Sequence, residues 1–531
     1  MMKKFFNDTG ACFPEEHYMV DISNKIKRMF EMLDRGNYFV INRPRQYGKT
    51  TLIGILNRFL KSQNDFFPIK ISFEGIGADG FQDSLSFIEA FLSELKNNLK
   101  TAGNNNIIKF INTNISLKRI DELGIWLSEL IRIIGKKTVL MIDEVDKSSN
   151  NQLFLDFLGM LRNKYLKRRE EGEYTFYSVI LAGVHDVKNL KLKIRQESDT
   201  KFNSPWNIAV NFNLDLSFEP IEISSMLKHY TEETGIKMDI DAIAASIFYY
   251  TSGYPFLVSK ICKIIDEEIL PGGNKDNWTQ NDVEKAINLL LKEKNTNFEN
   301  LVKNLENNKD LYDLVRKITL SDEKFGFNVL DPLIDKGIIY GIFKTGGPLV
   351  EIHNRIYKEL ILDYMTSIFK REAILKSPSI NYSLEFSYLK EDGTFDFEKV
   401  LLKFQEFMKK EYSSRDEEFL ERHGRLIFLA FLKPILNGKG YDFKEAQASE
   451  EKRMDVIVTY DNKKFIIELK IWRGQKLHEK GILQLTDYLE SQGMDTGYLI
   501  IFDFIGKTKK GKIYKKKHIN ANGKVIFAVW V

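Results

Sequence analysis

One glycine, one lysine and two threonines stand where an apolar, β-favouring run passes into a helical pattern. The run covers residues 38–42, and the four residues are Gly48, Lys49, Thr50 and Thr51. At such a junction the glycine lets backbone N–H groups close on phosphate oxygens, the lysine reaches the β- and γ-phosphates, and the next hydroxyl binds Mg²⁺. The spacing therefore predicts a loop that binds a nucleoside triphosphate.

Two adjacent carboxylates further along the chain point to the same chemistry. Asp143 and Glu144 follow an apolar run over residues 138–142. We expect Asp143 to hold Mg²⁺ together with Thr50, and Glu144 to orient and polarise the attacking water. Asp146 is a weaker candidate for the same region. The loop and the carboxylate pair together are far more specific than either one alone.

The start of the loop departs from the general pattern. Arg43 stands where such a loop usually begins with glycine, so its tight turn must form in another way. Arg43 or Arg45 could contact a phosphate or stack on the base. The alternative is that Pro44 stiffens the loop and both guanidinium groups are solvated.

Three further segments could complete this site. Arg162 could serve as an arginine finger, although a surface ion pair is the simpler interpretation. His185 and Asp186 follow another apolar run, where a polar residue could sense the γ-phosphate. The turn at residues 254–255 could close over the nucleotide or could simply join two helices.

A second group of chemistry-bearing residues lies on a predicted hairpin, formed by residues 453–460 and 465–471. Because side chains alternate along a strand, Glu468 and Lys470 share one face, while the apolar positions of the second run enter a core. Asp455 on the neighbouring strand can point to the same side. Two such carboxylates form a hard-oxygen Mg²⁺ site, and the lysine would orient a metal-bound water for attack on a phosphodiester. The alternative is an exposed hairpin with an ordinary Glu–Lys pair.

Residues around the hairpin could support this site. Glu418 or Glu421 on the preceding helix could supply a further carboxylate, and Gln484 and Tyr488 share one face of the following helix. The lysine-rich segment 507–518 is either a solvated turn or a surface that contacts phosphates.

The elements that must position these residues alternate between strands and helices over residues 1–230. Candidate strands are 38–42, 67–72, 138–142, 177–182 and 209–212. Such alternation predicts a parallel sheet with helices on both faces. The expected divisions are 1–230 for this α/β core, 231–295 for a helical lid, 296–370 for a winged helix, 371–400 for a linker and 401–531 for a separate α/β unit.

Composition sets wider bounds. A chain of 531 residues is too long for one core, so we expect about three or four domains. The net charge of +4 neither demands nor excludes nucleic acid. Cys12 and Cys262 show no metal-binding spacing and fit a reduced, cytoplasmic setting. No uncharged stretch approaches the ~20 residues of a spanning helix, so no membrane contact is expected.

Residues 1–370 resemble the AAA-like ATPases with an Arg-Pro-Arg-x-aromatic-Gly-Lys-Thr/Ser loop, here at residues 43–50, which often carry a C-terminal PD-(D/E)XK nuclease domain. That family normally has arginine where Arg43 stands, and residues 13–21 are also similar to it. The resemblance implies ATP and Mg²⁺ as cofactors and a nuclease domain over residues 401–531. Its implied site residues are Gly48, Lys49, Thr50 and Thr51 for the nucleotide, Asp143 and Glu144 for Mg²⁺ and water, and Asp455, Glu468 and Lys470 for the nuclease, with Glu418 as a less certain acid and Gln484 and Tyr488 as an accessory pair.

The expected function is therefore an ATP-hydrolysing protein that controls Mg²⁺-dependent cleavage of nucleic acid, with DNA as the favoured substrate. Bacterial defence or mobile-element biology is suggested by analogy alone. The alternative is a nucleotide-switched nucleic-acid-binding protein, or a signalling ATPase that acts on protein partners, without cleavage. Assembly as a homo-oligomer is left open.

Overall fold

The computed structural model describes residues 4–100, 105–113, 117–145, 152–184, 206, 208–210, 212, 214–273, 276–320, 325–328, 330–344, 347–376, 388, 390, 394–411, 424–425, 427–429, 431–432, 435, 440–443, 447–449, 452–453, 456–460, 463–472, 474–503, 507–508, 511–512 and 514–531. The chain divides into two compact units. Unit 1 comprises Met1–Leu311 and Gly326–Ile356, and unit 2 comprises Tyr312–Phe325 and Tyr357–Val531. Across the described residues, no helix combines the length and the apolar character that crossing a bilayer requires.

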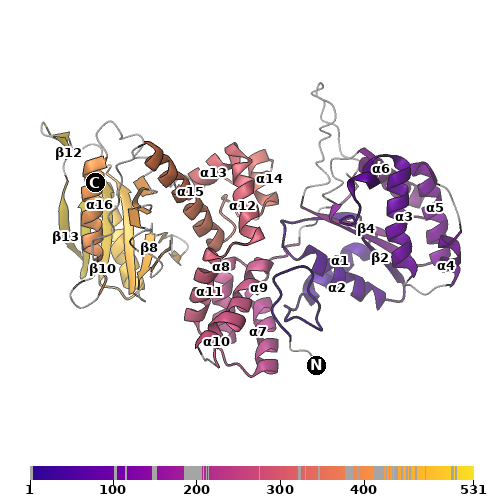
Figure 1. Ribbon diagram of the computed structural model, residues 1–531, viewed down its shortest axis with the longest axis horizontal. Coiled ribbons are helices and arrows are strands. Elements are labelled where there is room, and N and C mark those ends of the chain that lie inside the picture. Colours follow the sequence, from indigo (N-terminus) through magenta and orange to yellow (C-terminus); the bar gives the residue numbers. More distant parts are fainter. Residues whose placement is uncertain are drawn as a thin grey trace. The chain divides into compact units, whose positions relative to one another are not determined.

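A four-stranded parallel sheet forms the centre of unit 1 (Figure 1). Its strands, in the spatial order β1-β4-β3-β2, are β1 (Phe39–Asn42), β4 (Ser178–Gly183), β3 (Lys137–Asp143) and β2 (Phe66–Ser72). β3 and β4 are almost entirely buried, as continuous apolar runs are when both faces of a sheet are covered. Because all three strand pairs are parallel, the C-terminal ends of β1, β3 and β4 lie at one edge.

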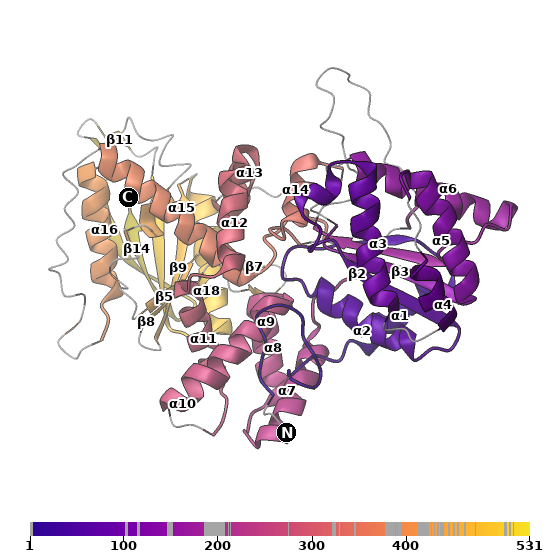
Figure 2. The same ribbon diagram turned by 45° about the vertical axis from the view of Figure 1, so that its right-hand side comes forward.

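Helices cover both faces of this sheet (Figure 2). One face packs against α3 (Ser84–Lys100), α4 (Asn105–Ile111), α5 (Ile120–Ile134) and α6 (Gln152–Glu170) through a core rich in phenylalanine and leucine. The other face carries α1 (Ser23–Asp34) and α2 (Lys49–Lys61). A short 3₁₀ helix, η1 (Ala78–Phe81), precedes α3. The predicted α/β sandwich is therefore present.

Helices dominate the chain after this core. They are α7 (Pro220–Thr234), α8 (Ile240–Thr251), α9 (Pro255–Ile264), the π-helix Ile265–Ile269, α10 (Leu270–Gly273), α11 (Gln280–Lys292), α12 (Thr296–Glu306), α13 (Lys309–Leu320), α14 (Pro332–Ile339) and α15 (Arg355–Lys376). Helices α8 and α9 are joined by residues 252–254, the turn expected from the sequence. The C-terminal cap of α8 is Ser252, whose φ of 48° is left-handed.

Unit 2 is built on a mixed sheet with the order β13-β14-β10-β9-β8-β5. The strands are β5 (Gly440–Phe443), β8 (Val456–Tyr460), β9 (Lys463–Ile471), β10 (Thr496–Phe502), β13 (Lys516–Ala521) and β14 (Lys524–Trp530). Two small ribbons, β6 (Gln447–Ser449) with β7 (Lys452–Arg453) and β11 (Lys507–Thr508) with β12 (Gly511–Lys512), are separate from it. Helix α16 (Phe397–Glu411) packs on one face and α18 (Gln475–Ser491) on the other. Strands β9, β10 and β14 run parallel at its centre.

Three expectations about secondary structure need correction within the described residues. The fifth strand of the core is reduced to a single parallel bridge between Val210 and Phe39. The expected winged-helix hairpin is shorter than predicted and pairs residues 342–344 with 351–353 around an antiparallel bridge between Phe343 and Ile352, while the winged helix itself stays a prediction. Helix α15 continues to Lys376, so helical backbone occupies the first part of the expected linker. In each case the local sequence pattern gave the wrong length for a strand or a helix.

Candidate functional sites

The predicted phosphate-binding loop joins β1 to α2, with Gly48 as the N-terminal cap of the helix. The φ of Gly48 is 76°, a left-handed value that glycine adopts without the steric cost of a Cβ atom. The side chain of Lys49 is buried, and its Nζ donates to the carbonyl oxygens of Arg43 and Pro44, each at 2.9 Å. The loop therefore curls around the lysine, and the backbone N–H groups of the first turn of α2 point out of the same end.

The two loop arginines take different positions. The guanidinium of Arg43 donates to the carbonyl oxygens of Asn42 at 2.7 Å and Leu214 at 2.6 Å, and it lies 5.8 Å from the ring of Phe212. Burial lowers the pKa of this guanidinium. Arg43 thus links the end of β1 to the segment that contains Phe212 and Leu214. The side chain of Arg45 is exposed, and the structure gives it no contact that decides its predicted role.

The two carboxylates lie at the same edge of the sheet as the loop. Strand β4 separates β1 from β3, so two strand spacings, about 10 Å, lie between the end of β1 and the end of β3. Asp143 is 2% exposed, and its Oδ1 accepts a hydrogen bond from the backbone N–H of Glu144 at 3.0 Å. Glu144 has a φ of 55°, a left-handed conformation that costs energy outside glycine and that concentrates at functional sites.

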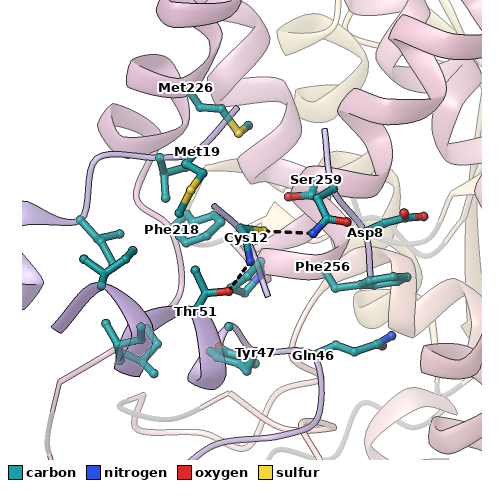
Figure 3. Close-up of a pocket in the computed structure, with 18 of the residues that line it drawn as sticks. Asp8, Cys12, Met19, Gln46, Tyr47, Thr51, Phe218, Met226, Phe256 and Ser259 are labelled. Atoms are coloured by element: carbon teal, nitrogen blue, oxygen red, sulfur yellow. Dashed lines mark hydrogen bonds between the residues drawn. The ribbon is translucent and has the colours of Figure 1, made fainter. Parts of the chain in front are cut away.

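A pocket of mostly apolar residues opens beside the loop (Figure 3). Its walls come from the N-terminal segment, the start of α2 and helices α7 and α9, and they include Met19, Phe218, Met226 and Phe256. Gln46, Asn7, Asp8 and Ser259 add polar groups, and Gly48 and Pro255 also line the pocket. A concave, mostly apolar lining with a few polar groups is typical of small-molecule sites in general.

The N-terminal segment is held against the rest of unit 1 at two points, one on α2 and one on α9. The backbone N–H of Cys12 donates to Thr51 Oγ1 at 3.0 Å, and Asn7 Nδ2 lies 3.6 Å from Cys12 Sγ (Figure 3). Burial raises the pKa of the Cys12 thiol. Asp8 forms ion pairs with Lys260 at 3.1 Å and with Lys263 at 2.7 Å, both on α9. Thr51 is part of the pocket wall and holds the backbone of Cys12 through its hydroxyl.

The remaining predictions for unit 1 have different outcomes. The turn at 254–255 does meet the loop, because Tyr254 donates its hydroxyl to the carbonyl oxygen of Arg45 at 2.8 Å. Arg162 lies ten residues into α6, about 15 Å along the helix from its start. Its role as an arginine finger stays a prediction. Asp146, His185 and Asp186 lie outside the described residues.

The predicted alternation along β9 is confirmed in unit 2. Phe465, Ile467 and Leu469 enter the core under α16, whereas Ile466 belongs to the core under α18. Glu468 and Lys470 therefore share the face that α18 covers. The side chain of Glu468 is 2% exposed, and Lys470 Nζ lies 2.7 Å from Glu468 Oε1, with 35% of the lysine side chain exposed.

Helix α18 closes this face. Its Gly481 lies against Lys470, since a Cβ atom there would lie 3.4 Å from Cε of Lys470. Tyr488 is fully buried against the sheet and Gln484 is half-buried on the same helix. Asp455, Glu418, Glu421 and His423 fall outside the described residues, so the second carboxylate of the predicted metal site is a prediction only. Among the described side chains, no three metal-ligating groups converge.

Sequence reasoning missed most of the pocket walls. Asp8, Met19, Met226 and Phe256 are separated by long stretches of chain, and no local spacing connects them. The buried link between Tyr47 and His353, whose Oη and Nε2 atoms are 2.9 Å apart, was also unforeseen. The only available signal was the resemblance of residues 13–21 to a known family, which pointed to the N-terminal segment without giving its role.

Comparison with known proteins gives two family matches, one in each half of the chain. An AAA-like domain family matches residues 15–358, more than half of the chain, and the PD-(D/E)XK nuclease superfamily matches residues 441–514. An uncharacterised WD repeat-containing protein of Synechocystis sp. is 26% identical over 273 residues, which are 50% of this chain and 21% of that protein. The chain thus spans about a fifth of this curated relative.

Two solved structures are similar to the chain at low identity. A Walker-type ATPase of Pyrococcus abyssi shares 14% identity with a TM-score of 0.46, covering 67% of this chain and 99% of its own. Cdc6p of Pyrobaculum aerophilum shares 14% identity with a TM-score of 0.33, covering 69% of this chain and 97% of its own. By its match over residues 15–358, the chain belongs to the AAA-like domain family, and its C-terminal part carries a domain of the PD-(D/E)XK nuclease superfamily.

Proposed function

We propose that the chain binds and hydrolyses ATP in unit 1 and, under the control of that nucleotide, cleaves DNA with a Mg²⁺-dependent site in unit 2. The observation that carries the proposal is that each family match contains a buried charged residue poised for its chemistry. These residues are Lys49 inside its loop and Glu468 paired with Lys470 on β9. Burying a charged side chain costs free energy even when it has partners, so buried charges at these two places support a chemical role.

The residues of unit 1 fit ATP and Mg²⁺ by their donor chemistry. The pocket beside Gly48 takes the base, and the backbone N–H groups at the start of α2 take the phosphates. Lys49 exchanges its bonds to loop carbonyls for phosphate oxygens. Thr50 and Asp143 offer the hydroxyl and carboxylate that Mg²⁺ prefers, and the ion would neutralise charge on the phosphates. Glu144, at the end of β3, orients the water that attacks.

The residues of unit 2 fit a phosphodiesterase site. Glu468 and Asp455 would hold Mg²⁺, which would activate a water and offset the charge that develops on the phosphate. Lys470 forms an ion pair with the Glu468 carboxylate and would present its ammonium to the scissile phosphate. Strand β13 bears exposed Lys516 and Lys517, which supply positive charge for the backbone of DNA.

Cleavage of plasmid by the purified full chain, with Mg²⁺ and ATP, tests this function. We expect Glu468→Ala and Lys470→Ala to abolish cleavage while ATP turnover is retained, and Lys49→Ala to abolish ATP turnover. Lys464→Ala is the matched control, because Lys464 is an exposed lysine on the same strand. Cleavage that persists in Glu468→Ala, or that is indifferent to ATP in the wild type, would contradict the proposal. DNA binding without cleavage in any divalent metal would favour the nucleotide-switched binding protein.

A further inference from the structure

The outer side of the phosphate-binding loop is buried against chain that lies far away in the sequence. The hydroxyl of Tyr47 lies 2.6 Å from Ser217 Oγ and 2.9 Å from His353 Nε2, within hydrogen-bonding distance of both. Its ring packs edge-on against Tyr254 with centroids 4.7 Å apart, and Tyr254 lies 5.3 Å from His353. Tyr47 is 5% exposed, so the loop inserts an aromatic anchor between three distant segments of unit 1.

The same surroundings hold the loop backbone. Tyr254 donates its hydroxyl to the carbonyl oxygen of Arg45. Pro44 packs directly on Gly341, where a Cβ atom would lie 2.8 Å from Pro44 Cγ and where the φ of 72° also favours glycine. Because Lys49 donates to the carbonyls of residues 43 and 44, these contacts set where the lysine is held.

The loop requires such support. Gln46 has a φ of 57°, a left-handed conformation that a non-glycine residue keeps only when its surroundings impose it. Its Nε2 donates to Thr296 Oγ1 at 3.2 Å, which adds one more contact from outside the sheet. The conformation that presents Gly48 and Lys49 is therefore imposed by tertiary contacts as well as by the loop sequence.

We propose that Tyr47 and His353 are a positioning pair that holds the phosphate-binding loop in its nucleotide-accepting shape, so that the contacts of Gly341 and His353 with the loop raise the affinity for ATP. This rests on the proposed ATP site. By linkage, a contact that strengthens nucleotide binding is itself strengthened when nucleotide binds. The pair touches neither the attacking water nor Asp143, so it acts through the loop and not on the chemical step.

The state of the histidine agrees with this role. His353 is buried, and burial, with a further contribution from nearby Lys344, lowers its pKa to about 4, while Asp215 opposes the shift. Burial likewise raises the pKa of the Tyr47 hydroxyl. At neutral pH the pair is therefore an uncharged phenol and an uncharged imidazole, and their hydrogen bond needs no protonation step.

Nucleotide affinity and turnover of single variants test the pair in the full chain. Tyr47→Phe and His353→Leu should each weaken binding of ADP and of ATP with Mg²⁺ about three- to tenfold, the effect of one lost buried hydrogen bond. KM should rise by the same factor while kcat stays within about twofold, because the lost contact stabilises the bound substrate and the transition state equally. The double variant should be no weaker than the weaker single variant, and His353→Gln, which can still bond the phenol, should restore most of the affinity.

Tyr38→Phe is the matched control, since it removes a buried phenol hydroxyl that donates to the Phe176 carbonyl away from the loop. It should leave nucleotide affinity unchanged. Unchanged affinity in both Tyr47→Phe and His353→Leu, or losses that simply add in the double variant, would overturn the pair while leaving the ATP site intact. If the wild-type chain binds no nucleotide, the proposed function itself fails, and the pair fails with it.

Discussion

Removal of the Asp8 carboxylate should detach the N-terminal wall of the pocket beside Gly48. Asp8 accepts from Lys263 at 2.7 Å and from Lys260 at 3.1 Å, and only 10% of its side chain is exposed. Hydrogen bonds to charged groups contribute about 1.5–3 kcal/mol each. Lys260 keeps its ion pair with Glu293 at 2.8 Å, and Lys263 is 27% exposed, so both lysines tolerate the loss. We therefore expect Asp8→Ala to weaken docking of this segment by about 2–3 kcal/mol.

Hydrogen exchange of the segment measures this directly. The backbone N–H of Phe5 donates to Glu16 O, and that of Tyr18 donates to Phe5 O, so docking protects these amides. A loss of 2–3 kcal/mol should speed their exchange about 30- to 150-fold. Asp21→Ala is the control, because the Asp21 carboxylate bonds only its neighbour Ser23 among its side-chain contacts in the described residues. Exchange as slow as in the wild type would refute the assigned role of the ion pairs.

Acid provides an independent check on the same carboxylate. Burial alone would raise the pKa of Asp8, yet the two ammonium groups outweigh burial and hold the pKa below its usual value. A carboxyl whose folded pKa is depressed contributes stability above its unfolded pKa of about 4 and loses that stability as the pH falls further. Wild-type protection of the segment should therefore fall below about pH 4, whereas Asp8→Ala, which lacks the group, should show no such step.

Three other changes test the sites. Glu144→Gln should keep ATP binding and lower kcat about 10²- to 10⁴-fold, as read by a phosphate-release assay, if Glu144 orients the attacking water. Gly481→Val should reduce DNA cleavage without affecting ATP turnover, because the added atoms meet the Lys470 stem; full cleavage would show that the stem can move aside. The double variant Glu468→Leu with Lys470→Met should be inactive yet unfold at equal or higher denaturant concentration, since apolar replacements of buried ion pairs are often neutral or stabilising.

The fold was largely predictable where local pattern and burial coincide. Continuous apolar runs marked β1, β3 and β4 with ends displaced by about one residue, because strands covered on both faces have no polar positions. The alternation along β9 assigned Glu468 and Lys470 to one face, as the two cores confirm. The segment 209–212 failed because a strand needs a partner along its length, and in the described residues pairing reaches only Val210.

The sites were only half predictable, for a different reason. Side chains that carry the chemistry sit at fixed spacings, so Lys49, Asp143 and Glu468 stand out in the sequence. The contacts that hold them come from remote segments. From the sequence, Tyr47 is an ordinary aromatic residue of the loop, and only the structure shows His353 beside its hydroxyl. Asp8 likewise resembles a solvated acid in the sequence, whereas the structure pairs it with two lysines of α9. No periodicity connects residues hundreds of positions apart.

Both sites place a carboxylate on a strand that has a parallel neighbour. Asp143 ends β3, and Glu468 lies in the second half of β9 beside parallel β10. In a parallel sheet the C-terminal ends of neighbouring strands share one edge, so the loops that follow them converge there. Burial of Glu468 between apolar neighbours works against stability, and its ion pair with Lys470 only offsets that cost. If the variant Glu468→Leu with Lys470→Met is at least as stable as the wild type, the ion pair is not kept for stability, and a chemical role is the better explanation. If the variant is clearly less stable, the ion pair is structural.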